Sequence, residues 1–163
     1  MTIDDYTKET DGVQTPDELI ESTLHTVEGL LKQEFPDYLK FTNGSFTICR
    51  GSTQVIVTVR PFTNTETVVE CMAHVVSGAT ITTELLHFLL RKNSELHFGG
   101  FGLMFDDTIT FSHSVSGINL EGSVIRDSIN AVAIIADYYD DEIVKMAGGK
   151  RAADIFELDG EMG

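Results

Sequence analysis

Residues 121–146 read EGSVIRDSINAVAIIADYYDDEIVKM, which is the longest uninterrupted helical pattern in the chain. Apolar residues recur there at steps of three and four, the period of one face of an α-helix. Gly148 and Gly149 follow directly, and glycine is typical of a helix C-terminus. A helix of this length spans roughly 39 Å, so it can cross a small domain and organise the packing of the other elements. Its apolar positions are Val124, Ile125, Ile129, Val132, Ile135, Ala136, Tyr139, Ile143 and Met146.

A second helix is predicted near the start of the chain, from residue 15 to Pro36. Thr15 is the expected N-cap, with Pro16 at the first helical position and Glu18 completing a capping box. The apolar residues that follow again recur at helical spacing, and Pro36 ends the pattern.

Three strands are predicted next, over residues 45–50, 53–60 and 67–76, because these runs are rich in β-branched residues. Gly51-Ser52 occupies the first turn between them. Short turns join antiparallel neighbours, so the three strands are expected to form a meander. A short helix then covers about residues 82–92, with Asn93 as its C-terminal cap.

A second hairpin is predicted around the acidic turn Asp106-Asp107, and its loop length decides which side chains share a face. A three-residue loop that pairs Phe105 with Ile109 collects the large apolar residues on one face. A two-residue loop would scatter them over both faces, so the first register is preferred. Its apolar face then holds Phe101, Leu103, Phe105, Ile109, Phe111 and Val115. The opposite face is small and flat and holds Gly100, Gly102, Thr110, Ser112 and Ser114.

The predicted order is helix, three-stranded antiparallel meander, helix, two-stranded hairpin and long C-terminal helix. Helices packed against an antiparallel sheet make an α+β fold. Its 163 residues favour a single domain, which we expect over residues 15–158. Residues 1–14 and 159–163 are expected to be terminal tails.

The chain carries 26 acidic and 11 basic residues, a net charge of −15 at pH 7. This balance disfavours nucleic acid and anionic membrane surfaces as partners, because both require clustered Lys and Arg. The acidic start of the sequence does not resemble a secretory signal, and no apolar run is long enough to span a bilayer. Cys49 and Cys71 lie in strand-like runs and are expected to be small buried hydrophobes, so a reducing cytoplasm fits best.

The stretch from the short helix through the hairpin, followed by the long helix, resembles the YbjN-like proteins, which are related in fold to type III secretion chaperones. The resemblance rests on Asn93, on Gly100-Phe101-Gly102 and on the run ADYYD at residues 136–140, and it extends from about Thr15 to Gly149. It implies a non-enzymatic protein, often dimeric, that binds peptide segments of a partner. It supplies no catalytic residue and no client.

The residues themselves give little support for metal or catalytic chemistry. The acidic run Asp137, Asp140, Asp141 and Glu142 lacks calcium-loop spacing and is expected to be a solvated helix face. His97 and His113 form the best histidine pair. In the preferred register His113 faces Phe101, which leaves His97 roughly 13 Å along the sheet, so no zinc site is expected.

Two further catalytic or ligand-binding motifs are not supported by the sequence around them. Gly99-Gly100-Phe101-Gly102 lies in a strand with no helix after it, so it is not a phosphate loop. No G-x-S-x-G elbow or low-pKa cysteine environment is present, so nucleophilic catalysis is not predicted.

The sequence therefore predicts a protein- or peptide-binding, chaperone-like module without enzyme activity or cofactor. A small regulatory or sensor protein that binds a low-molecular-weight ligand is the alternative, and an unrecognised enzyme is a third reading. A homodimer is expected, because Ile134 and Tyr138 are apolar residues of the long helix outside its main stripe. The candidate partner-binding residues are Gly100, Gly102, Ser112, Ser114, Ile134 and Tyr138.

Overall fold

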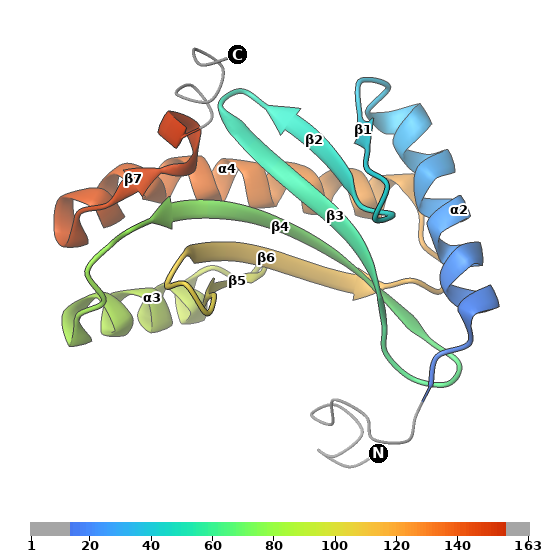
Figure 1. Ribbon diagram of the computed structural model, residues 1–163, viewed down its shortest axis with the longest axis horizontal. Coiled ribbons are helices and arrows are strands. Elements are labelled where there is room, and N and C mark those ends of the chain that lie inside the picture. The colour runs from blue at the N-terminus through green and yellow to red at the C-terminus, as the bar shows by residue number, and fades with distance from the viewer. Residues whose placement is uncertain (1–13, 156–163) are drawn as a thin grey trace.

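The computed structural model describes residues 14–155, and in it a long helix, α4, lies across one side of an antiparallel sheet (Figure 1). The helices are α2 (Asp17–Glu34), α3 (Thr83–Glu95) and α4 (Gly122–Ala147). The strands are β1 (Leu39–Lys40), β2 (Phe46–Arg50), β3 (Thr53–Pro61), β4 (Thr67–Ser77), β5 (Gly100–Leu103), β6 (Ile109–Ser116) and β7 (Lys150–Arg151). The predicted tail over residues 1–14 lies outside the described residues apart from Gln14, and the tail over 159–163 lies wholly outside them.

The described strands form one seven-stranded sheet with the order β1-β2-β3-β4-β6-β5, and β7 pairs with the end of β4. The predicted α+β fold is therefore confirmed, and the meander β2-β3-β4 is as expected. The hairpin strands extend this same sheet, because β6 pairs directly with β4 and leaves β5 at the edge. No pattern in the sequence predicted β1 and β7, since two residues are too few to show a period.

The hydrophobic core lies between one face of the sheet and the helices α2 and α4, and α3 adds Leu85 and Leu89 to it. Helix α4 contacts β2, β3, β4 and β6, so it covers most of the width of the sheet. Its side chains Ile125, Ile129, Val132 and Ile143 are completely buried, as the apolar stripe predicted. Val124 was expected in the stripe but is 41% exposed, whereas Ile125, the next residue in the same turn, is completely buried, so Val124 lies just outside the buried face.

The start of α2 differs from the predicted capping box. Pro16 is the N-cap and supplies no side-chain hydrogen bond. The Thr15 hydroxyl instead donates to the Thr63 carbonyl oxygen at 2.7 Å and accepts from the Phe62 amide at 3.1 Å. Both partners lie about 48 residues along the chain, so a tertiary contact at the β3–β4 turn replaces the local cap.

The hairpin register also differs from the prediction. Leu103 pairs with Ile109 and Phe101 pairs with Phe111, so residues 104–108 form a five-residue loop. The pairing has shifted by two residues, which preserves the predicted division of side chains between the two faces. Phe105 was expected in the apolar face but lies in the loop and is fully exposed. Met104, at the start of this loop, donates its amide hydrogen to the Thr108 carbonyl at 3.0 Å.

Asn93 does not cap α3. The helix continues to Glu95, and Leu96 is its C-cap. The Asn93 side chain instead bonds the edge of β5, where its oxygen accepts from the Phe101 amide at 2.6 Å and its nitrogen donates to the Phe101 carbonyl at 3.2 Å. Asn93 therefore joins α3 to the sheet.

Candidate functional site

The candidate partner-binding residues lie on two separate surfaces. Gly100, Gly102, Ser112 and Ser114 lie in β5 and β6, whose pairing places them on the sheet face opposite α2 and α4. We call this surface the open face. Gly102 and Ser114 are exposed, and Gly100 and Ser112 are half-buried. The predicted flat, small surface is thus assembled from adjacent strands.

The open face continues onto β4, which lies beside β6 in the centre of the sheet. Glu70 pairs with Ser114, and Met72 pairs with Ser112. Glu70 is also held by Arg60 of β3, whose Nε lies 2.8 Å from the carboxylate. The face therefore combines a row of hydroxyl groups on β6 with a mixed polar and apolar row on β4.

The edge of β5 is partly closed. The amide and carbonyl groups of Phe101 point away from β6 and are both bonded to Asn93. An edge strand normally offers these groups to an added strand. A partner that extended the sheet at β5 would first have to displace Asn93. At β5 the open face is therefore more accessible to a partner than the edge of the strand.

The second surface is the outer side of α4. Ile134 is 68% exposed and Tyr138, one turn later, is 72% exposed, which agrees with their expected position off the main stripe. The ring of Tyr138 packs edge-on against the ring of Tyr139, with 4.9 Å between the ring centres. The Tyr139 ring in turn contacts the ring of Phe101, with 5.6 Å between their centres. The two surfaces are on opposite sides of the sheet, so the structure does not unite the six candidate residues in one site.

An open groove of about 410 Å³ lies beside Ile134, between α4 and the β2–β3 turn. The sequence interpretation missed it, because its walls come from segments more than 80 residues apart. The Ser52 hydroxyl bridges these segments by donating to the Asp137 carboxylate at 3.3 Å. The groove is lined by Arg50, Gly51, Ser52, Ala133, Ile134 and Asp137.

Arg50 is the unusual residue of this groove. Its guanidinium lies 4.3 Å from the centre of the buried Phe35 ring, a cation–π contact. Its Nε is buried and has no hydrogen-bond partner, and among residues 14–155 no carboxylate pairs with it. In the sequence Arg50 is a lone arginine at the end of a predicted strand, and arginines in that position are too common to indicate a site.

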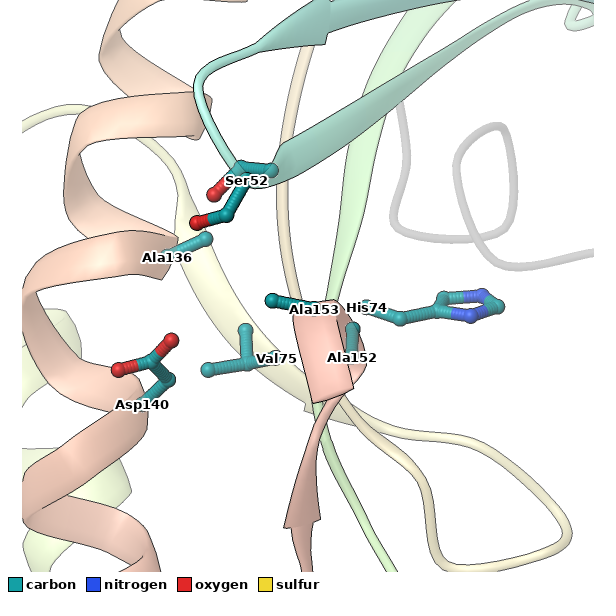
Figure 2. A pocket seen from close by; sticks show the side chains of 8 residues that line it. Ser52, His74, Val75, Ala136, Asp140, Ala152 and Ala153 are labelled. Carbon is teal, nitrogen blue, oxygen red and sulfur yellow. The ribbon is translucent and has the colours of Figure 1, made fainter. Parts of the chain in front are cut away.

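A second, much smaller cavity of about 10 Å³ lies between α4, β4 and the segment after β7 (Figure 2). It has room for about one water molecule. Asp140 lines it from α4, while the His74 ring points away from it, so the two side chains do not form an acid–base pair. Ala136, Ala152 and Ala153 supply apolar walls.

Asp140 corrects the prediction of a fully solvated acidic face. It is only 8% exposed, whereas Asp137, Asp141 and Glu142 are exposed. Burial raises the pKa of the Asp140 carboxyl above its usual value of 3.8. The folded protein therefore holds this proton more tightly than the unfolded chain does. The protonated Asp140 carboxyl therefore adds to the free energy of unfolding at low pH. This contribution is lost as the pH rises above 3.8 and through the higher pKa of the folded protein, so the charged carboxylate is unfavourable at neutral pH.

We expect Asp140→Asn to raise the free energy of unfolding at pH 7, because the neutral amide removes the cost of a buried charge. The gain should shrink at pH 4, where the native carboxyl is partly protonated. Urea unfolding at both pH values measures the effect, and Glu142→Gln on the exposed side of α4 is the control. An Asp140→Asn variant that is equally destabilised at both pH values would contradict this account.

The two cysteines differ in environment. Cys71 is completely buried, and desolvation raises the pKa of its thiol to about 12. Cys49 was expected to be buried too but is exposed, because its side chain lies on the open face near the end of β2. Because its pKa is so high, the Cys71 thiol is not a nucleophile at neutral pH.

We therefore expect one thiol per native chain to react with Ellman's reagent at pH 8, and a second to react only after unfolding. Cys49→Ser should abolish the fast reaction, and Cys71→Ser should leave it unchanged. Rapid reaction of both thiols in the native protein would contradict the burial of Cys71.

The histidines remain dispersed. His113 pairs with Cys71 of β4 and stacks on Phe98 at 4.0 Å, rather than facing Phe101 as the predicted register required. Burial lowers the pKa of His113. Within residues 14–155 no group of three His, Cys, Asp or Glu side chains is arranged to hold a metal ion. No helix in the described part of the chain is long and apolar enough to cross a membrane.

A long helix packed on one face of an antiparallel sheet makes this a small α+β protein, as expected for the secretion-chaperone class. Comparison with protein families supports this assignment directly. The chain belongs to the family described as T3SS (YopN, CesT) and YbjN peptide-binding chaperone 1, whose model matches residues 17–155. The match covers every helix and strand described above. The comparison with curated proteins gives no match.

Proposed function

We propose that this protein is a non-enzymatic, chaperone-like module of the cytoplasm that holds an extended segment of a client protein. The observation that carries the proposal is the match of residues 17–155 to a family of peptide-binding chaperones. The geometry is compatible with it. Glycines in a strand allow another backbone to approach closely, and Gly100 and Gly102 lie beside the hydroxyl groups of β6.

Two surfaces are proposed for the client. The open face would contact a flat backbone through Gly100, Gly102, Ser112 and Ser114. The outer side of α4 would bury apolar side chains against Ile134 and Tyr138, which are both largely exposed in the single chain. Exposed apolar side chains of this size contribute binding free energy when a partner covers them.

The function is tested with a phage-displayed library of random dodecapeptides, selected on the full chain. Enriched peptides are synthesised, and their affinities are measured by fluorescence anisotropy. Ser114→Arg blocks the open face and Ile134→Asp places a charge on α4. Asn64→Arg in the exposed β3–β4 turn and Val124→Asp at the start of α4 are the matched controls. Circular dichroism verifies that each variant folds.

We expect specific peptides to be enriched, and one blocking variant to weaken their binding at least tenfold while its control changes it less than twofold. Failure to enrich any peptide would reject the proposal. A small molecule that co-purifies reproducibly with a chain that binds no peptide would favour the sensor alternative instead.

We also propose that residues 15–158 form one domain and that two chains form a homodimer. A second copy would cover the apolar residues of α4 when no client occupies them, and symmetric pairing is the commonest way to do so. Light scattering after size exclusion at micromolar concentration should give twice the mass of one chain. A monomer at high concentration would reject the dimer without affecting the peptide-binding proposal.

A further inference from the structure

We infer that the groove beside α4 binds a carboxylate of the client segment, with the Arg50 guanidinium as its ion-pair partner. The inference rests on the proposed peptide-binding function and specifies its chemistry. The ligand is an extended segment with one Asp or Glu side chain next to an apolar residue. The carboxylate would bind Arg50, and the apolar side chain would pack against Ala133 and Ile134.

The first argument is the unsatisfied state of Arg50. Its Nε is buried without a hydrogen bond. Its other two guanidinium nitrogens are not buried and have no partner among the described residues, so they are open to a ligand. Buried charged donors are normally paired, because leaving them unpaired is costly. Among residues 14–155 no acidic side chain pairs with Arg50, although this part of the chain is rich in Asp and Glu. The groove therefore presents a cation to which the carboxylate of a ligand can bind.

The second argument is that Arg50 is held in place for binding. The central carbon of the guanidinium lies 4.3 Å from the centre of the Phe35 ring, so the ring supports the guanidinium on one side. Phe35 itself is only 1% exposed, so this support is rigid. A planar guanidinium with a fixed orientation favours two parallel hydrogen bonds to one carboxylate.

The third argument concerns the neighbouring carboxylate and the space. Asp137 lines the same groove but accepts from the Ser52 hydroxyl rather than from Arg50. Gly51, between Arg50 and Ser52, has φ +57°, and no heavy atom lies within 4 Å of where its Cβ would be. The turn therefore carries no side chain at Gly51 that would crowd a ligand in the groove.

The charge of the whole molecule limits the ligand further. A net charge of −15 repels polyanions at long range. At physiological salt the field is screened within about 8 Å, so a single carboxylate in contact with Arg50 is accepted. The apolar side chains Ala133 and Ile134 on one wall favour a peptide over a small hydrophilic anion. The segment is therefore expected to be neutral or basic apart from this one carboxylate.

The probe is a library of N-acetylated, C-amidated nonapeptides with Glu fixed at the centre, compared with the same library carrying Gln. Binding is measured by anisotropy, and the Arg50 Nε–H resonance is followed by ¹H–¹⁵N NMR. Arg50→Gln and Arg50→Lys test the cation. Arg91→Gln is the matched control, because Arg91 is an exposed arginine of α3 that has no ion-pair partner in the described chain. Sodium acetate, and Gln peptides with a free C-terminus, test other sources of the carboxylate.

We expect Glu peptides to bind the wild-type protein at least tenfold more tightly than Gln peptides and to shift the Arg50 Nε–H signal. Arg50→Gln should abolish this preference, Arg50→Lys should reduce it, and Arg91→Gln should retain it. Should the glutamine variant fail to fold, the wild-type preference and the Arg50 signal still decide the question.

Equal binding of Glu and Gln peptides, or a preference that survives Arg50→Gln, would overturn the inference while leaving the peptide-binding function intact. Acetate that produces the same Arg50 shift at micromolar concentration would identify a small-anion site and overturn it as well. A preference found only for the free C-terminus would replace the side-chain carboxylate with a chain end. Absence of any peptide binding would reject the inference and the proposed function together.

Discussion

Ile129→Ala is expected to lower the free energy of unfolding by about 2–5 kcal/mol. Ile129 lies in the middle of α4 and is completely buried in the core. Its neighbours on the same stripe, Ile125 and Val132, are equally buried, so they cannot move easily to fill the space. The substitution removes apolar contacts and leaves a cavity at the contact that joins α4 to the sheet.

Urea unfolding at pH 7 and 25 °C, followed by circular dichroism, measures this loss. Ile134→Ala makes the same chemical change on the same helix, but its side chain is 68% exposed. Its effect should therefore stay within about 0.5 kcal/mol. Equal destabilisation by the two variants would mean that Ile129 is not in the core.

Gly149→Ala is expected to destabilise the protein by about 2–5 kcal/mol, the sum of a backbone strain and a steric overlap. Gly149 has φ +88°, a conformation that side chains disfavour. A Cβ there would lie 2.6 Å from the Ser77 carbonyl oxygen and 2.7 Å from the Ala79 amide nitrogen. These are backbone atoms, which cannot rotate away. The chain passes this close because β7, directly after Gly149, pairs with the end of β4.

Gly148→Ala separates the two contributions. Gly148 also has a positive φ, +71°, but no heavy atom lies within 4 Å of its Cβ position. Only the backbone strain applies, and a loss of about 1–2 kcal/mol is expected. Thermal and urea unfolding of both variants give the comparison. Similar losses at the two positions would show that the close approach of Gly149 to β4 contributes nothing.

The sequence alone was sufficient where the repeat within a single helix or strand decides which face of that element is buried. The burial of Ile129 and the exposure of Ile134 and Tyr138 follow from the 3.6-residue period of α4, because a helix turns its residues to fixed directions. The division of β5 and β6 into an apolar and a small polar face follows from the two-residue period of a strand. It survived an error of two residues in the register because two is a whole period.

The sequence also determined the family, since the residues that carry the resemblance lie in fixed order between Asn93 and residue 140 and the family model matches residues 17–155. It did not determine the details of capping. Thr15 and Asn93 are typical capping residues, and both had a plausible local role. Each bonds a backbone group elsewhere, at the β3–β4 turn and at β5, because the fold brings those groups within reach. Only the tertiary structure can decide between a local and a distant partner.

The candidate groove was decided entirely by tertiary structure. Arg50 and Ile134 are distant in sequence, and no pattern in either segment points to the other. Cys49 shows the same limit for a single side chain, because its strand has two faces and only the packing leaves the face that holds Cys49 exposed. Asp140 differs, since it follows Ala136 by four residues and precedes Ile143 by three, so the period of α4 places it on the buried face although its neighbours in sequence are acidic. Periodicity gives the direction of a side chain from its own element. The residues that this side chain contacts belong to segments that are remote in sequence, and the positions of those segments are set only when the core packs.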